Sequence, residues 1–264
     1  MHIDPSPTIS NLGGKGFQLT LLREVCPVPD FFIVYFDSKD EIENDDVQKQ
    51  ILHTFETHSF HCVSVRSSAT MEDSKTASFA GVFESELNVT KNDLIHAIQN
   101  VLSSMTNERV IEYCSINKLN FRSIEMRVIV QKMVNSRISG VCITKIRKES
   151  DTLLLEACLG LGEALVSGLV TPDTYKVNRT TLTVESETIG FQKVMIPAFK
   201  RSEHVPVPFY QQNSKKLRLH EINEISKSCL KIEEHIGYES ADIEWAYEGS
   251  TLYILQARPF IGQI

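Results

Sequence analysis

The sequence lacks paired cysteine motifs, long apolar segments and an excess of positive charge. Its six cysteines show no C-x-x-C spacing, a pattern typical of buried thiols in a reducing cytosol rather than of disulfides or a zinc site. The polar N-terminus and the lack of a long apolar run predict neither secretion nor a membrane span. A formal charge of -7 argues against nucleic acid or an acidic membrane as the main partner. We therefore expect a cytoplasmic protein.

Hydrophobic periodicity predicts a mixed α+β fold without internal repeats. The 264 residues are enough for two hydrophobic cores. A stripe of apolar residues at helical spacing, from Ile222 to Ile236, predicts a packed helix that Gly237 ends. Thr90 is a candidate N-cap for a helix that begins at Lys91. The predicted helices cover 17–25, 45–57, 91–105, 108–116 and 215–237, and the predicted strands cover 29–36, 83–89, 125–134, 138–146, 153–157, 175–177 and 181–187.

A strand-like run from Val63 changes abruptly into small, hydroxyl-rich residues around one positive charge, Arg66. Such a strand can deliver a phosphate-binding loop, because hydroxyls and open backbone amides donate to anionic oxygens and an arginine adds a two-pronged contact. The alternative is an ordinary turn in which Arg66 pairs with Glu72 or Asp73. The small residues that we expect to serve the phosphates are Ser67, Ser68, Ala69, Thr70, Ala80 and Gly81.

Residues 11–16, Asn-Leu-Gly-Gly-Lys-Gly, precede an amphipathic run and predict a glycine-rich loop that opens a helix at Phe17. A helix N-terminus with exposed amides favours an anion, and Lys15 adds a mobile positive charge beside it. The G-x-x-x-x-G-K-[ST] spacing of a Walker A loop is absent. The alternative is a simple glycine turn with a solvated lysine.

Two strand-like runs near the C-terminus flank a Glu-Gly-Ser-Thr turn and predict a β-hairpin. With residues 249–251 as its loop, Glu244 lies opposite Gln256 on one sheet face, and the pleat adds Arg258 to that face. A carboxylate, an amide oxygen and a guanidinium suit a Mg²⁺–triphosphate complex. The alternative is an edge hairpin with a surface Glu–Arg pair.

Taken together, these segments resemble the N-terminal ATP-binding domain of phosphoenolpyruvate synthase, pyruvate phosphate dikinase and rifampin phosphotransferase. The glycine-rich segment is similar to the family's G-G-K-G loop, and residues 63–81 are similar to its V-R-S-S-A-T…S-F-A-G signature. Residues 128–141 resemble a V-Q-x-M-V…S-G-V hinge, and 160–173 resemble G-L-G-E-x-x-V-S-G-x-V-T-P-D. Residues 242–259 resemble the closing D-I-E-W-A…L-Y-I-L-Q-A-R-P. Five motifs in the family's order make the resemblance highly specific.

The resemblance implies an ATP-grasp fold with mixed and antiparallel sheets, in which the nucleotide lies between two α+β lobes. The lobes would cover 1–131 and 132–264 and form a single ATP-binding module. The hinge strand would cover 126–133, with Gln131 and the backbone near Met133 facing the adenine. Buried backbone groups can read a purine edge without charged side chains, so the apolar character of this strand is no obstacle.

The same resemblance assigns roles to individual residues. Lys15, Arg66 and Arg258 would be the catalytic residues, because they neutralise phosphate charge. Glu244 and Gln256 would hold Mg²⁺. In the loop at 160–173, bracing of the loop is an equal alternative to nucleotide contact for Thr171 and Asp173. The further implied nucleotide contacts are Gly14, Ser67, Gly81, Ser85, Gln131, Met133 and Glu163.

Members of this family cleave ATP to AMP and phosphate and pass the β-phosphoryl group to a histidine on a swivelling domain. None of the eight histidines of this chain stands in the family's G-G-x-x-[ST]-H motif. The resemblance therefore implies the ATP-binding subunit of a dikinase that works with a separate phosphohistidine-domain protein and a small-molecule acceptor. Two alternatives remain: a self-sufficient small-molecule kinase that uses ATP directly, and a non-catalytic nucleotide-binding regulatory module.

Overall fold

The computed structural model describes residues 1–3, 8–70, 73–74, 77–78, 83–117, 120, 124–147, 149–200, 204–260 and 262. Gly81 and Ala80, which the sequence assigns to a phosphate loop, lie outside these residues, as does Glu72. The chain divides into two compact units. Residues 1–20 and 29–133 form unit 1, and residues 21–28 and 134–264 form unit 2.

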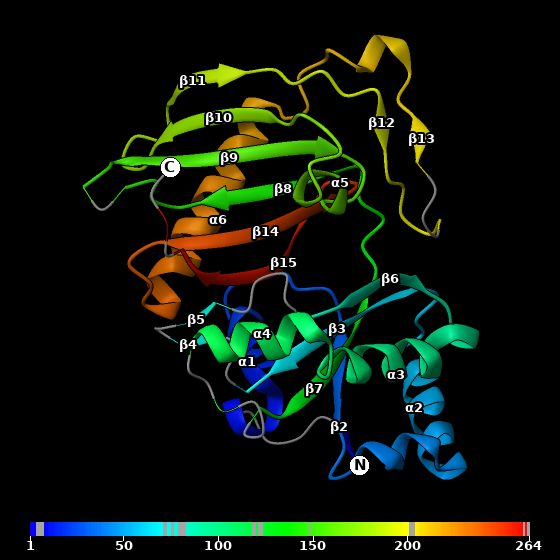
Figure 1. Ribbon diagram of the computed structural model, residues 1–264. Helices are drawn as coiled ribbons and strands as arrows, with labels where there is room; N and C mark the ends of the chain where they lie inside the picture. The colour runs from blue at the N-terminus through cyan, green and yellow to red at the C-terminus, as the bar shows by residue number, and fades with distance from the viewer. Residues whose placement is uncertain are drawn as a thin grey trace. The chain divides into compact units, whose positions relative to one another are not determined.

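Unit 1 contains a five-stranded antiparallel sheet (Figure 1). β7 (Met126–Lys132) lies at its centre, with β2 (Phe31–Tyr35) and β3 (Val63–Ala69) on either side. β1 (His2–Ile3) and β6 (Ser85–Val89) form the edges. The apolar residues of β7 are buried along the whole strand, as expected for a strand that is covered on both faces.

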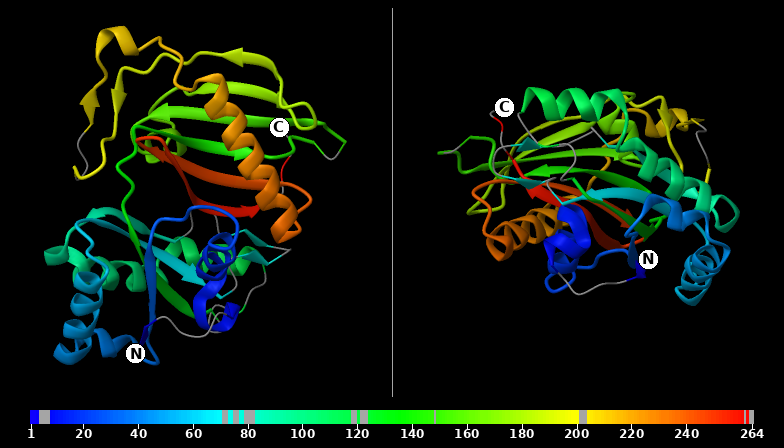
Figure 2. Two further views of the ribbon diagram at one scale, coloured as in Figure 1. Left: turned by 180° about the vertical axis from the view of Figure 1, so that it is seen from behind. Right: turned by 60° about the horizontal axis from the view of Figure 1, so that its bottom comes forward.

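One face of this sheet packs in a core with three helices. These are α2 (Asp45–Thr57), α3 (Leu94–Ser104) and α4 (Glu108–Ile116). From β3, the core takes Val63 and Val65, and these are completely buried. Because side chains alternate along a strand, Ser64, Arg66 and Ser68 face the other side of the sheet. Both views of the ribbon place α1 on that other side (Figures 1 and 2).

α1 (Ile9–Leu22) contains the glycine-rich segment and differs from the predicted loop. Helical residues begin before the glycines, and a break at Gly13, with φ 71° and ψ 174°, separates a first turn from the main helix. Glycine fits there because a Cβ would overlap the carbonyl oxygen of Ser68. The prediction of a loop that opens a helix at Phe17 was wrong, since Lys15 already lies in the first turn of the second helical segment.

Unit 2 contains a six-stranded sheet in which every neighbouring pair is antiparallel. The hydrophobic runs predicted as strands all form strands here, and β9 extends further at both ends than the predicted 153–157. From edge to edge the strands are β11 (Val184–Thr188), β10 (Asp173–Asn178), β9 (Thr152–Leu159), β8 (Ile138–Ile143), β14 (Ala241–Glu248) and β15 (Thr251–Pro259).

α6 (Leu219–Ile236) lies across one face of the unit 2 sheet (Figure 2). Its stripe from Ile222 to Ile232 is completely buried, which confirms the predicted packed helix. Gly237 ends the helix in the left-handed conformation, with φ 76°. The opposite face of the sheet carries the polar residues of the C-terminal hairpin.

The α+β class with antiparallel sheets is confirmed, and no parallel pair occurs among the strands that the structure describes. Thr90 does not cap a helix as predicted, because its hydroxyl donates to the carboxylate of Asp93 at 3.0 Å and a 3₁₀ turn, η2 (Lys91–Asp93), intervenes. The remaining short elements are η1 (Lys39–Glu43), β4 (Asp73–Ser74), β5 (Ala77–Ser78), α5 (Glu163–Val166), β12 (Val194–Met195), β13 (Val205–Pro206) and η4 (Phe209–Gln211).

Two expectations from composition can be compared with the fold. In the described part of the chain, no helix combines the length and the apolar character needed to cross a membrane. The six cysteines are thiols, and five of them are buried. Their burial agrees with the prediction of buried thiols.

Candidate functional site

A buried glutamine pairs with Arg66 on the face of the unit 1 sheet that α1 shares. Nη1 of Arg66, on β3, donates to Oε1 of Gln131, on β7, at 3.1 Å. Gln131 is 2% exposed, and its Nε2 has no hydrogen-bond partner among the described residues. A buried donor without a partner is costly, so this amide is suited to an acceptor on a bound molecule. Ser85 lies opposite Arg66 in the register of β3 and β6, and it adds an exposed hydroxyl to the same face.

Ser68 holds the break in α1 against the sheet. Its hydroxyl donates to the carbonyl oxygen of Leu12 at 2.8 Å and accepts from the amide of Gly16 at 2.9 Å. A serine hydroxyl has one hydrogen, and here that hydrogen is already used. The prediction that Ser68 donates to a phosphate was therefore wrong. Ser68 instead braces the turn that carries Lys15.

Lys15 is folded back toward β3. Its Nζ donates to the carbonyl oxygen of Ser67 at 3.3 Å and lies 3.4 Å from the Ser67 hydroxyl. Contacts of this length are weak hydrogen bonds. Lys15 is partly exposed, and Gly14 beside it is buried. The structure thus brings Lys15 and Ser67 together.

Two further residues of the predicted nucleotide site serve strand pairing. The amide of Met133 donates to the carbonyl oxygen of Cys62 at 3.0 Å, so this N–H is not a donor for a purine. Thr70 accepts at its hydroxyl from the amide of Glu125 at 3.3 Å, and its own amide donates to the Glu125 carbonyl at 3.1 Å. Thr70 therefore joins the ends of β3 and β7, and its hydroxyl hydrogen is not used in these two contacts.

In unit 2, β14 and β15 form the predicted hairpin with a tighter turn than expected. The loop is the two residues 249–250, not 249–251. A β-bulge next to Glu244 supplies the residue that the shorter loop omits, and Glu244 therefore still lies opposite Gln256. The predicted pair is correct, but the physical reason is the bulge and not the loop length.

Arg258 is engaged by Asp242 on the neighbouring strand. Nε and Nη2 of Arg258 donate to Oδ2 of Asp242 at 2.9 and 2.7 Å. This Asp–Arg pair takes the place of the surface Glu–Arg pair considered as the alternative. Burial raises the pKa of the Asp242 carboxyl, Arg258 opposes that shift, and Glu244 adds to it. The sequence analysis missed Asp242, although its position two residues before Glu244 puts it on the same strand face.

A third carboxylate, in addition to Asp242 and Glu244, lies on the same face of the unit 2 sheet. Val141 on β8 lies between Glu244 on β14 and Glu156 on β9 in the strand register. Burial first, and then the nearby Asp242 charge, raise the pKa of Glu156. A bound cation would relieve this concentration of negative charge on the sheet.

The donor chemistry of Glu244 and Gln256 fits Mg²⁺. Among the described residues, no group of three or more His, Cys, Asp or Glu side chains could hold a metal ion by itself. Mg²⁺ in nucleotide sites uses one or two carboxylates and completes its shell with phosphate oxygens and water. Glu244 and Gln256 would supply a carboxylate and an amide oxygen to such a shell. The metal would supply charge neutralisation at the phosphates.

The loop that begins at Gly160 is anchored by two serine hydroxyls. Ser136 and Ser139 donate to the carbonyl oxygen of Gly160 at 2.8 and 2.7 Å. Gly140 permits close approach of β8 to β9, because a Cβ there would overlap the carbonyl oxygen of Glu156. The Ser-Gly-Val motif therefore braces this loop. Glu163 follows as the exposed first residue of α5.

Asp173, at the end of the same loop, is completely buried. Its carboxylate accepts from the amides of Gly190 and Lys216, at 3.0 and 2.7 Å, and forms an ion pair with the Lys216 ammonium at 2.8 Å. These contacts favour the bracing alternative for Asp173. Thr171 is exposed.

The unit 1 sheet thus pairs the half-buried Arg66 with the buried Gln131, and the unit 2 sheet sets Glu244 opposite Gln256. Residues 41–263 match the family model described as "Pyruvate phosphate dikinase, AMP/ATP-binding domain". This match covers most of the chain, and the chain belongs to that family. Lys15 precedes the matched residues.

Curated relatives extend the match toward the N-terminus. The chain is 34% identical over 297 residues to a probable phosphoenolpyruvate synthase of Archaeoglobus fulgidus, covering 94% of this chain and 39% of the relative. It is 39% identical over 202 residues to a probable phosphoenolpyruvate synthase of Methanocaldococcus jannaschii, covering 75% and 17%. It is 35% identical over 204 residues to the rifampicin phosphotransferase of Bacillus cereus, covering 75% and 23%. The chain thus spans well under half the length of these relatives.

Among solved structures, the D-alanyl-alanine synthetase A of Vibrio cholerae superposes with a TM-score of 0.44 and 11% sequence identity. The superposition covers 98% of this chain and 58% of the synthetase. A likeness at this level is too weak to carry a conclusion. The family assignment rests on the sequence matches.

Proposed function

We propose that this chain is the Mg·ATP-binding module of a phosphoenolpyruvate synthase-like dikinase. The observation that carries the proposal is the register that sets Glu244 directly opposite Gln256, with Asp242 and Arg258 paired beside them. Hard oxygen ligands next to a guanidinium suit Mg²⁺ with bound phosphates. The names of the relatives, phosphoenolpyruvate synthase and rifampicin phosphotransferase, support the same class of reaction.

In this proposal, the chain is a single ATP-binding module with lobes at 1–131 and 132–264. Nε2 of Gln131 donates to an acceptor of the base, and the cations neutralise the phosphates. Glu244 and Gln256 hold the metal. The phosphate-neutralising residues are Lys15, Arg66 and Arg258, and the further nucleotide contacts are Gly14, Ser67, Ser85 and Glu163.

The proposed reaction passes the β-phosphoryl group of ATP to a histidine outside this chain, on a partner protein. A P–N bond forms at the imidazole, and the bond between the α-phosphate and the β-phosphoryl group breaks with AMP as leaving group. The bond between the β- and γ-phosphoryl groups also breaks, because water attacks the γ-phosphorus and releases it as phosphate. None of the eight histidines in these 264 residues stands in the family's acceptor motif, so the accepting histidine would lie outside them. The phosphohistidine would then serve a small-molecule acceptor. The buried thiols support a cytoplasmic setting.

Binding of Mg·ATP should stabilise the protein against heat. At a nucleotide concentration of about 100 times Kd, binding to the folded state contributes about 2.7 kcal/mol, which corresponds to a rise in melting temperature of several degrees. Thermal melts with Mg·ATP, with ATP plus a chelator, and with neither ligand measure this directly. Mg·ATP should give the largest rise. No shift at millimolar Mg·ATP would contradict the proposed function.

A further inference from the structure

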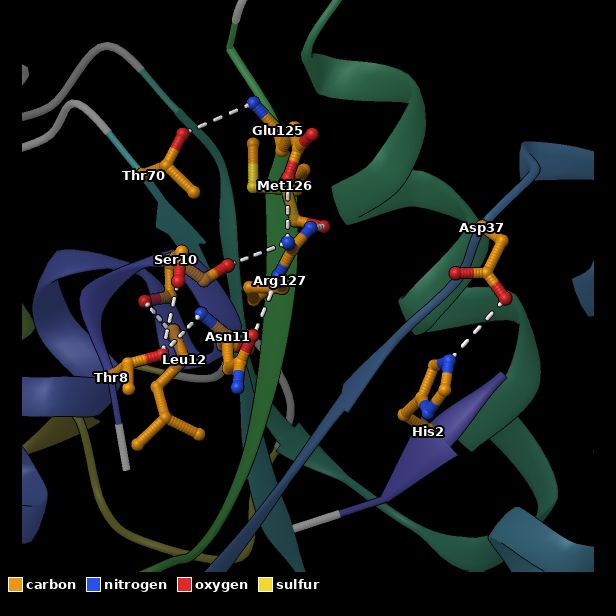
Figure 3. A network of polar contacts seen from close by, with 11 residues as sticks. His2, Thr8, Ser10, Asn11, Leu12, Asp37, Thr70, Glu125, Met126 and Arg127 are labelled. Carbon is orange, nitrogen blue, oxygen red and sulfur yellow. Dashed lines mark hydrogen bonds and ion pairs between the residues drawn. The ribbon is translucent and has the colours of Figure 1, made fainter. Parts of the chain in front are cut away.

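Arg127 is a buried charged residue near the start of β7, and no motif of the sequence singles it out. It lies on β7, is 6% exposed, and stands directly opposite Ser68 in the register of β3 and β7. Its guanidinium carbon lies 4.3 Å from the centre of the Tyr35 ring. A buried guanidinium is costly unless strong partners satisfy it. Figure 3 shows two kinds of partner: the Glu125 carboxylate and the Met126 carbonyl on the neighbouring residues, with Nη2 of Arg127 2.7 Å from Oε2 of Glu125, and backbone carbonyls in the first turn of α1.

The guanidinium binds the carbonyl groups that precede the break in α1. Nε donates to the carbonyl oxygen of Asn11 at 3.1 Å, and Nη2 donates to that of Ser10 at 2.7 Å. A helix that ends leaves its last carbonyls without intrahelical donors. Arg127 supplies donors to two of them, and Ser68 supplies the donor to the carbonyl of Leu12 at 2.8 Å. Arg127 and Ser68 together therefore satisfy the three carbonyls of residues 10–12.

Arg127 also opposes the continuous helix that the same residues could form. If residue 13 were helical, the amides of Gly14 and Lys15 would bind the carbonyls of Ser10 and Asn11 in the usual i to i−4 pattern. Arg127 occupies both carbonyls instead. The broken form begins a new helix at Gly14, which puts Lys15 in a first turn, where anions are favoured.

We propose that Arg127, together with Ser68, is a positioning residue that fixes where Lys15 meets the phosphate groups of the nucleotide. This inference rests on the proposed Mg·ATP-binding function. Arg127 itself lies beneath the turn, and it acts through the backbone of α1. Holding the turn in its binding geometry before the ligand arrives reduces the ordering cost of binding.

The test combines amide exchange with nucleotide binding in the full chain. Arg127→Met should speed hydrogen exchange at the amides of residues 13–16 without nucleotide and weaken Mg·ATP binding by about tenfold to a hundredfold. Arg127→Lys, which keeps one charged donor, should recover part of both losses. Ser68→Ala removes only a hydroxyl group, and it should likewise speed hydrogen exchange at the amides of residues 13–16. Arg109→Met removes an equal charge from an exposed position on α4 and should change neither quantity.

A second measurement of Arg127→Met, in a protein that also carries Lys15→Ala, separates the positioning role from a merely structural one. If Arg127 acts by placing Lys15, Arg127→Met should weaken Mg·ATP binding much less when Lys15 is already absent. An equal loss in both backgrounds would overturn the proposal, as would unchanged exchange in Arg127→Met and Ser68→Ala. If Arg127→Met does not fold, Arg127→Lys and Ser68→Ala decide the question. A wild-type protein that binds no Mg·ATP would overturn the proposed function, and the exchange data would still test whether Arg127 holds the turn.

Discussion

Replacing Arg66 with alanine should lower ATP turnover by about a thousandfold or more while leaving most of the protein folded. An arginine that stabilises charge on a transferring phosphoryl group contributes an effect of at least about this size. The cost in stability should be modest, about 1–3 kcal/mol, because Arg66 is partly exposed and the loss includes its hydrogen bond to Oε1 of the buried Gln131. Steady-state ATP turnover with a phosphohistidine-domain protein of this family present, and a thermal melt of the same preparation of the chain, separate the two effects.

Arg66→Lys is the informative companion, because it keeps the charge and loses the planar fork. Compared with Arg66→Ala, Arg66→Lys should recover more of the lost stability than of the lost ATP turnover. Glu244→Ala should match Arg66→Ala in turnover if the two residues serve the same phosphates through guanidinium and metal. Arg109→Met, exposed on α4, is the matched charge control and should behave as wild type. Unfolding of Arg66→Ala, together with no effect of nucleotide on the wild-type melt, would favour a purely structural role for Arg66.

Replacing Asp173 with alanine should have the largest effect on stability. Asp173 and Lys216 form an ion pair whose side chains are both 0% exposed, and removal of one partner leaves a buried charge uncompensated. The carboxylate also accepts from the hydroxyl of Tyr175 at 2.8 Å and from the amide of Gly190 at 3.0 Å. We expect a loss of about 3–5 kcal/mol in the free energy of unfolding and a fall in melting temperature of about 10 °C or more.

The contacts of Asp173 also predict which of three variants loses the most stability. Lys216→Met should cost less than Asp173→Ala, because the carboxylate keeps the amide and hydroxyl donors around it. Asp151→Ala removes an equal charge from an exposed position in unit 2 and should be nearly neutral. Chemical denaturation of the three variants measures this order. Equal stabilities for Asp173→Ala and Asp151→Ala would refute the bracing role.

Local sequence signals predicted the elements of this fold well where one periodicity dominated. The helices at 45–57 and 108–116 match α2 and α4 residue for residue, and Gly237 ends α6 as expected. The pairing of Glu244 with Gln256 was also predicted, but from a three-residue loop. Nothing in the sequence indicated the shorter loop or the β-bulge that compensates for it. Bulges depend on how neighbouring strands pack, and a single sequence carries little information about that.

The site residues show a second limit of sequence reasoning. Motif spacing identified Lys15 and Arg66, but it could not tell a hydroxyl that serves a ligand from one that braces the backbone. Ser68 binds both Leu12 and Gly16, which lie more than 50 residues away in the chain. Arg127 likewise finds its partners in α1. Such long-range contacts follow only from the fold.

The most direct test of the dikinase account is product analysis with ATP that carries a radioactive β-phosphoryl group, in the presence and absence of a phosphohistidine-domain protein of this family. With that partner, we predict AMP and phosphate as products and an acid-labile label on the partner's histidine. Without it, the chain should form little AMP and should not label itself. ADP formation with a small-molecule acceptor and no partner would contradict the account and support a self-sufficient kinase, and Mg·ATP binding without any turnover would support a regulatory module.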